Sequence, residues 1–218
     1  DVDGDGFDDV MAAGQAQYAL VLGGPDAHVI RTHWSTNFGT AAALGDVDGD
    51  GRPDYLIGWP RNSQNGTYTG AVIAYSGVDG SVLYEVHGDK PYDGDFNGDN
   101  LGWSVMAVGD LDHDDIVDFA AGAPGGWGAL WATGPGYVRL YSGATGLLIR
   151  KAAGDTPDAH LGIALGAGGD INGDGLEDWM AGAPGETVDI SGQGSASVFS
   201  GKTRTKLWKL LGTELSHD

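Results

Sequence analysis

The chain has 218 residues, of which 41% are apolar and 40 are glycine, and its formal net charge is −20. The apolar content excludes a disordered acidic tail, and the net charge disfavours nucleic acids and anionic membrane surfaces as partners while it favours cations. The absence of cysteine excludes a disulfide framework and thiolate metal sites, and no stretch is apolar for long enough to insert into a membrane.

Short apolar runs separated by glycine and aspartate predict an all-β chain of antiparallel strands. An acidic loop begins at Asp1 and is followed by predicted strands over 18–24 and 28–33. The next segment shows the complete unit, with an acidic loop between the first and second of its four predicted strands. These strands span 40–45, 55–60, 70–77 and 81–86. Four short strands joined by tight turns are typical of a meander, and the unit recurs along the chain.

Acidic loops mark four repeats, which begin at Asp1, Asp46, Asp110 and Asp170. Three repeats contain all four strands, and the first lacks the strand that precedes its loop. We therefore expect about four blades of four-stranded antiparallel sheet in a single β-propeller domain, or part of one, over 1–218. The approximate repeat limits are 1–37, 38–100, 101–160 and 161–218. Because residue 1 already lies inside a motif, the chain is expected to be a mature product or a fragment.

The acidic loops have the composition of calcium sites. Of the 31 acidic residues, 18 lie in four windows of nine residues, where they repel one another unless a cation neutralises them. Calcium takes six to eight oxygen ligands. In each loop, the side chains at positions 1, 3, 5 and 9 and the backbone carbonyl at position 7 offer such oxygens. The predicted ligands are Asp1, Asp3, Asp5, Phe7 and Asp9; Asp46, Asp48, Asp50, Arg52 and Asp54; Asp110, Asp112, Asp114, Ile116 and Asp118; and Asp170, Asn172, Asp174, Leu176 and Asp178.

Glycine at positions 4 and 6 allows the tight turn that these loops need. The third loop is the exception, with His113 and Asp115 at these positions. Aspartate tolerates the left-handed conformation better than most residues, so we expect this loop still to bind calcium, although more weakly than the others.

EF-hands are a competing explanation of such loops. They require a bidentate acid at position 12 and flanking helices, whereas position 12 here is alanine or isoleucine and the flanks resemble strands. A fifth acidic run, 93–99, has Leu101 at position 9 and is expected to be a polar connection between strands.

The motifs around the loops resemble the FG-GAP repeat of integrin α-subunit β-propellers and related bacterial proteins. The name describes Phe-Gly before the loop and Gly-Ala-Pro after it. The residues at the Phe-Gly position are Phe38-Gly39, Leu101-Gly102 and Leu161-Gly162. Those at the Gly-Ala-Pro position are Gly58-Trp59-Pro60, Gly122-Ala123-Pro124 and Gly182-Ala183-Pro184. The resemblance implies up to four calcium ions, held by loops that join the first two strands of each blade. Because propellers of this family have about seven blades, three architectures stay open: a fragment, a compact four-bladed ring, or two copies that form an eight-bladed ring.

The resemblance implies a non-enzymatic module for extracellular or cell-surface adhesion or recognition, in which calcium is structural and the partner is a protein or a glycan. Trp127 and Trp131, on a glycine-rich stretch, are candidates for sugar stacking in a lectin, although packing on a neighbouring blade is the favoured expectation. Trp59, Trp103 and Trp179 are expected in the core. A polysaccharide lyase or hydrolase is the alternative, but the six histidines do not recur at one repeat position.

Overall fold

The computed structural model describes residues 1–218 except 15–16, 36, 91–97, 126–133, 189–192 and 214–218. Within the described residues the chain forms fifteen strands and no helix, arranged in four antiparallel sheets. Blade one contains β1 (Val10–Ala12), β2 (Tyr18–Leu22) and β3 (Val29–Trp34). Blade two contains β4 (Ala41–Gly45), β5 (Asp54–Trp59), β6 (Ala71–Tyr75) and β7 (Val82–His87). Blade three contains β8 (Ser104–Val108), β9 (Asp118–Ala123), β10 (Tyr137–Tyr141) and β11 (Leu148–Ala153). Blade four contains β12 (Ala164–Gly169), β13 (Asp178–Ala183), β14 (Ser195–Phe199) and β15 (Lys206–Leu211).

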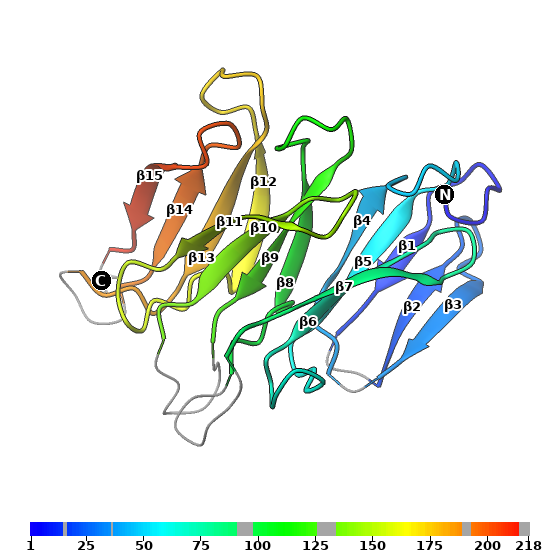
Figure 1. Ribbon diagram of the computed structural model, residues 1–218, viewed down its shortest axis with the longest axis horizontal. Coiled ribbons are helices and arrows are strands. Elements are labelled where there is room, and N and C mark those ends of the chain that lie inside the picture. The colour runs from blue at the N-terminus through cyan, green and yellow to red at the C-terminus, as the bar shows by residue number, and fades with distance from the viewer. Residues whose placement is uncertain (15–16, 36, 91–97, 126–133, 189–192, 214–218) are drawn as a thin grey trace, which may run out of the picture.

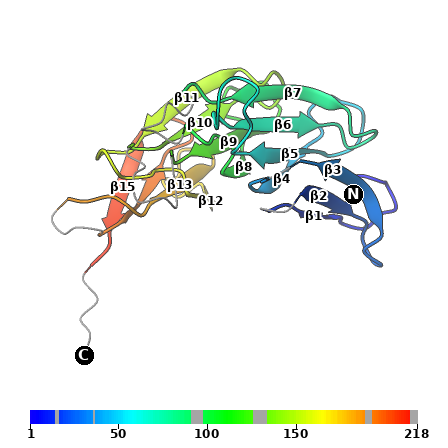
Figure 2. The same ribbon diagram turned by 90° about the horizontal axis from the view of Figure 1, so that it is seen from below.

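Each sheet is a meander in which consecutive strands pair, so the strand order in space equals the order in the chain. The first strands of blades two to four, β4, β8 and β12, lie side by side on the inner side of the molecule, and β7, β11 and β15 form the outer edges (Figures 1 and 2). Figure 2 shows the four sheets following an open arc, with blades one and four at its two ends. The compact four-bladed ring, one of the three expected architectures, is therefore not formed by the chain alone.

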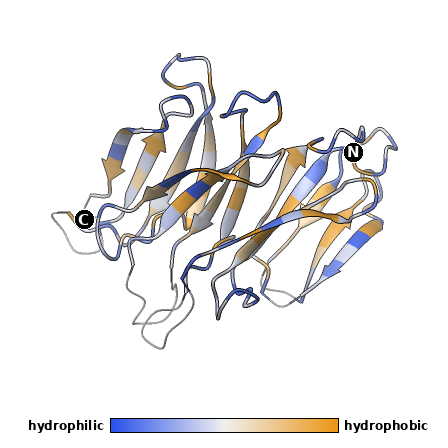
Figure 3. Cartoon of the chain, viewed as in Figure 1, coloured by the Kyte–Doolittle hydropathy of each residue, from blue (hydrophilic) through white to orange (hydrophobic). Residues whose placement is uncertain are grey.

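The core consists of layers between successive blades. Strands β5, β6, β9 and β10 are buried along both faces, apart from half-buried Trp59, because each contacts a blade on either side. Apolar residues are concentrated on the strands, whereas the connections between them are mostly hydrophilic (Figure 3). This arrangement explains why these four strands are largely apolar on both faces, with Arg139 as the charged residue inside β10.

The FG-GAP positions help join one blade to the next. Leu101 and Leu161 are buried, and each forms an isolated parallel bridge to the preceding blade, with Gly70 and Gly136 respectively. Phe38 is buried at the same position of blade two. These large side chains precede the first strands of blades two to four, and they anchor the chain where it enters each of these blades.

The predicted strands of the first two repeats agree with the structure to within two residues at each end. Trp179 is fully buried, as predicted, and stacks on Phe199. Trp59 and Trp103 are only half-buried, so the prediction that all three tryptophans lie in the core is wrong in part. Trp59 is the last residue of β5 and Trp103 directly precedes β8, so both lie at the ends of strands.

Candidate metal centres

All four acidic loops lie at the same end of the sheets, at the top of Figure 1. Three of them join the first two strands of blades two, three and four, and the remaining loop leads into β1. The hairpin position follows from the sequence, because each loop is enclosed between two apolar strand segments.

The carboxylate at position 1 organises each loop through backbone amides. In the second loop, Asp46 accepts hydrogen bonds from the amides of Gly49 and Gly51 at 2.8 and 2.9 Å. Asp110 accepts equivalent bonds from the amides of His113 and Asp115 at 2.7 and 2.9 Å. These amides hold the pKa of Asp110 below its usual range, although its partial burial acts in the opposite direction. The backbone amides therefore fix the position 1 carboxylate in place, and in the third loop they favour its ionised form.

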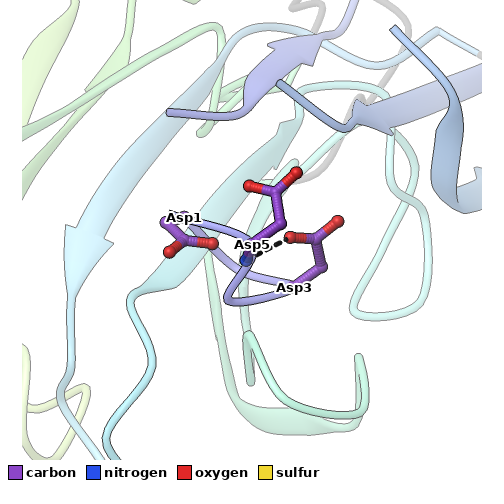
Figure 4. A group of neighbouring side chains, drawn as sticks. All are labelled: Asp1, Asp3 and Asp5. Atoms are coloured by element: carbon purple, nitrogen blue, oxygen red, sulfur yellow. Dashed lines mark hydrogen bonds between the residues drawn. The ribbon is translucent and has the colours of Figure 1, made fainter. Parts of the chain in front are cut away.

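Carboxylates converge within three of the loops. In each of these loops three carboxylates present oxygens that all lie within 4.8 Å of one another. Figure 4 shows the first group on its loop, where the amide of Asp5 donates to the carboxylate of Asp3. The three groups are Asp1, Asp3 and Asp5; Asp46, Asp48 and Asp50; and Asp110, Asp112 and Asp118. Hard oxygen donors clustered at this spacing match the preference of calcium.

The third loop adopts the same backbone conformation as the others without their glycines. His113 and Asp115 have φ angles of 66° and 68°, compared with 77° and 92° for Gly49 and Gly51. Both residues are exposed, so the side chains meet no steric obstacle beyond their own backbone. Both residues thus occupy the left-handed region that glycine occupies in the other loops, and weaker calcium binding at this loop stays a prediction.

The carboxylate at position 9 has a different environment from the rest. Asp118 is fully buried, and its two oxygens accept hydrogen bonds from the amides of Leu111 and Gly143 at 2.7 and 3.0 Å. Burial raises the pKa of Asp118 to about 6, in spite of these bonds. The same pair of bonds recurs in the other loops, at Asp9, Asp54 and Asp178. Position 9 therefore clamps the loop to the turn between the third and fourth strands, a role that sequence reasoning missed.

The fourth loop has an amide at position 3. The side-chain nitrogen of Asn172 donates to Asp178 at 3.3 Å, and Asp174 accepts from the hydroxyl of Ser200 at 2.9 Å. The second loop has a related contact, from Ser76 to Asp50 at 3.3 Å. In blades two to four a serine precedes the glycine of the turn between the third and fourth strands. This repeated Ser-Gly is the signal in the sequence from which a contact between the serine and the loop was predictable.

The four residues predicted to offer a backbone carbonyl lie at the exit of their loops. Their amides donate to the carboxylate at position 5, at 2.9 to 3.2 Å. They are Phe7, Arg52, Ile116 and Leu176. Arg52 also reaches the preceding loop, where its guanidinium lies 3.9 Å from the carboxylate of Asp1. One residue thus connects two neighbouring loops.

The sequence singled out further residues besides these loops. Trp127, Trp131 and residues 93–97 lie outside the described part of the chain. Asp99, at the end of the fifth acidic run, is buried, and it accepts hydrogen bonds from the amide of Lys90 and the hydroxyl of Tyr137. A cavity of about 180 Å³ lies beside Phe38 and Trp103, and Arg61 is the charged residue of its lining.

The fold and the loops define an all-β repeat protein of about four propeller-type blades, each with an acidic loop at the same position. Residues 1–57 match the model of the FG-GAP-like repeat, and residues 161–199 match the model of the FG-GAP repeat. The chain belongs to the FG-GAP repeat family.

Comparison with curated proteins gives integrin alpha subunits as relatives. The chain is 32% identical to integrin alpha-V of Gallus gallus over 151 residues, which is 67% of this chain and 14% of the relative. It is 32% identical to integrin alpha-E of Homo sapiens over 163 residues, and the shares are 69% and 14%. It is 31% identical to integrin alpha-PS5 of Drosophila melanogaster over 160 residues, with shares of 68% and 15%. The chain thus spans about one seventh of the length of these relatives. Among the described residues there is no helix of the length and apolarity that crossing a membrane requires.

Proposed function

We propose that the chain is a calcium-binding β-propeller module for adhesion or recognition outside the cell, in which calcium stabilises the scaffold. The observation that carries the proposal is the convergence of carboxylates in loops of one conformation, repeated from blade to blade. Carboxylates at this separation repel one another, so a cation bound among them would stabilise each loop.

The residues that would hold the ion are those at positions 1, 3 and 5 of each loop, with the backbone carbonyl at position 7. The carboxylate at position 9 contributes through whichever lone pairs its two amide bonds leave unused. In the fourth loop, the oxygen of the Asn172 side chain replaces one carboxylate, so this site carries one negative charge fewer.

The expected role of the ion is to neutralise the loops. Extracellular calcium modules bind with a Kd of roughly 10⁻⁴–10⁻³ M, so calcium at about 1 mM adds about 0.4–1.4 kcal/mol of stability per site. Several sites in one chain together shift the unfolding equilibrium by a few kcal/mol, which is a large part of the stability of a domain.

The assignment to adhesion or recognition rests on the relatives, which are integrin alpha subunits. We propose that residues 1–218 form a single unit of such a propeller, at the cell surface or outside the cell, with a protein or a glycan as its partner. Calcium bound at one end of the sheets leaves the loops at the opposite end free to vary and to contact that partner.

The test is calorimetric titration of the chelator-treated protein with calcium chloride, together with thermal unfolding in calcium and in chelator. We expect up to four sites and a lower melting temperature in chelator. Asp48→Asn removes one carboxylate of the second group and should remove or weaken one site. Asp158→Asn removes an exposed carboxylate outside the loops and should leave the titration unchanged. A melting temperature that does not respond to calcium would contradict the structural role, and a titration without heat or saturation would contradict binding.

A further inference from the structure

The first and second loops offer the same ligands, but their surroundings differ. Each has aspartate at positions 1, 3, 5 and 9 and glycine at positions 4 and 6. In both loops the amide at position 6 donates to the position 1 carboxylate, at 3.0 Å from Gly6 to Asp1 and at 2.9 Å from Gly51 to Asp46. The ligand set alone therefore predicts equal calcium affinity, and a difference between the two loops has to come from neighbouring residues.

A guanidinium group fills the space beside position 4 of the first loop. The Nη1, Nη2 and Cζ atoms of Arg52 occupy the place that a Cβ atom on Gly4 would take. At position 4 of the second and fourth loops, Gly49 and Gly173 have no described atom beyond their chain neighbours within 4 Å of the Cβ position. The glycine of the first loop thus permits a φ angle of 79° and also leaves room for this side chain.

The same guanidinium group lies beside a carboxylate of the first loop. The Nη1 atom of Arg52 is 3.9 Å from the Oδ1 atom of Asp1, and the two side chains are 35% and 31% exposed, so water screens the pair only in part. An arginine side chain stays positively charged at physiological pH. A permanent positive charge is therefore directed at a predicted ligand of calcium.

Both partners of this contact are held in place. The amide of Arg52 donates to Asp50 at 2.9 Å, and its backbone carbonyl is a predicted ligand of the second loop. The first loop is held against blade two, because Val2 packs on the apolar layer between blades one and two and its amide donates to Asp9 at 2.6 Å. The contact thus belongs to an internal layer of the molecule, and one residue serves the second loop with its backbone and the first loop with its side chain.

The second loop has no such partner. Among the residues that the structure describes, no ion pair joins a basic side chain to the carboxylates of this loop. Its neighbour is the hydroxyl of Ser76, which donates to Asp50 at 3.3 Å. Blade one has Gly23 in place of this serine, and the imidazole of His28 fills the space, with its Nε2 atom 3.3 Å from Asp3. Basic side chains therefore contact the first loop, where the second loop has a hydroxyl.

We propose that the guanidinium group of Arg52 is a counter-cation that the second loop supplies to the first, and that it lowers the calcium affinity of the first loop. Calcium at the first loop competes with the attraction between Asp1 and Arg52, whereas calcium at the second loop meets no such competitor. An ion pair of this exposure is strong enough to change a dissociation constant by about two- to fivefold. This inference rests on the proposed calcium sites and adds a residue that regulates one of them.

The test is a calcium titration of the full chain, after removal of metal with a chelator, followed through the NMR signals of two backbone amides. The Gly6 and Gly51 amides report on their own loops, because each bonds to the position 1 carboxylate. Arg52→Gln keeps the backbone carbonyl and removes the charge. The affinity measured at Gly6 should therefore rise about two- to fivefold, and the affinity measured at Gly51 should change less.

Two further variants are the controls. Arg52→Lys keeps the charge, so its affinity at Gly6 should stay closer to that of the wild type than the affinity of Arg52→Gln does. Arg61→Gln removes one positive charge from the exposed connection between β5 and β6 and should leave both affinities unchanged. All titrations use the same pH, so that the charge of His28 is comparable in each.

Ionic strength separates an effect of charge from a change in loop shape. Screening acts over about 10 Å at 0.1 M salt and about 3 Å at 1 M salt. The ratio of the Gly6 affinities of Arg52→Gln and the wild type should fall toward one when sodium chloride is raised from about 0.05 M to about 1 M. A ratio that stays constant, or a Gly6 affinity that Arg52→Gln leaves unchanged or lowers, would overturn the inference, while a response at Gly51 would still support calcium binding. No response to calcium at either amide would contradict the proposed function and this inference with it.

Discussion

The carbonyl oxygen of Gly102 lies 2.0 Å from the position that a Cβ atom on Gly58 would occupy. Gly58 begins the Gly-Trp-Pro segment of blade two, and Gly102 ends the Leu-Gly segment of blade three. The pair repeats one blade further on, where the carbonyl of Gly162 lies 2.1 Å from the Cβ position of Gly122. The backbones of successive blades thus touch where the second half of the motif in one blade meets the first half of the motif in the next.

Substitution of this glycine by alanine tests the contact. Gly58→Ala places a methyl group on the Gly102 carbonyl, and because backbone cannot move aside cheaply we expect a loss of about 1–3 kcal/mol of unfolding free energy. Gly182→Ala is the matched control, since Gly182 has the same place in blade four and the described atom nearest to its Cβ position is 3.6 Å away. It should cost less than about 0.5 kcal/mol. Denaturant unfolding at a concentration where the chain is monomeric measures both, and equal losses would contradict the contact.

This pair also shows how far the sequence predicts the structure. Strand order and the hairpin position of the loops followed from apolar runs and turn residues, which are local signals. The reason for the glycine in the second half of the motif did not follow, because the atom that excludes a side chain there belongs to another blade. The half-burial of Trp103 was missed for the same reason, since the rim of a layer is set by contacts between blades.

The candidate sites divide in the same way. The alternation of aspartates indicated which side chains converge, and the structure brings three carboxylates together in three loops. The sequence gives no means to distinguish Asp118 from Asp112, because both are aspartates in one loop. Their environments differ. Asp118 is buried and accepts hydrogen bonds from two backbone amides, which lie 7 and 25 residues away in the chain, whereas Asp112 is exposed.

The clamp at position 9 predicts different costs for these two residues. In chelator, Asp118→Ala leaves the amides of Leu111 and Gly143 buried without partners, and we expect a loss of about 2–4 kcal/mol of unfolding free energy. Asp112→Ala removes an exposed carboxylate from the same loop and should change the stability in chelator by less than about 0.5 kcal/mol. Both variants should lose calcium at the third loop in titration. Similar stability of the two variants in chelator would show that the clamp contributes nothing beyond the metal site.

The left-handed residues of the third loop allow a reciprocal exchange. His113→Gly relieves a positive φ angle at a residue with a Cβ, so we expect a gain of up to about 1 kcal/mol in unfolding free energy. Gly49→His introduces the same side chain at the same position of the second loop, where no atom lies within 4 Å of the Cβ position, so only backbone strain opposes it. It should cost about 1 kcal/mol. Thermal unfolding in chelator measures both, and a change of the same sign in the two variants would contradict an effect of backbone conformation.

His33 is half-buried between blades one and two, where its Nε2 atom lies 2.8 Å from the hydroxyl of Tyr55 and its ring lies against Tyr75. Burial, with a smaller effect of the nearby Arg31 guanidinium, lowers the pKa of His33. The unfolded chain therefore binds a proton at a pH where the folded chain does not. It follows that this residue makes the fold less stable as the pH falls below about 6.5, down to the lowered pKa.

We therefore expect His33→Gln to change how stability varies with pH. The variant should be less stable than the wild type at a pH of about 7.5, because the ring contact is lost, and the difference should shrink as the pH falls to about 5. Tyr55→Phe is the control, since it removes the same hydrogen bond but keeps the imidazole, and its difference from the wild type should change less. Denaturant unfolding at several pH values measures these differences, and the chelator present in each experiment excludes effects of calcium binding. A His33→Gln difference that stays constant over this range would show that the imidazole titrates alike in the folded and unfolded chains.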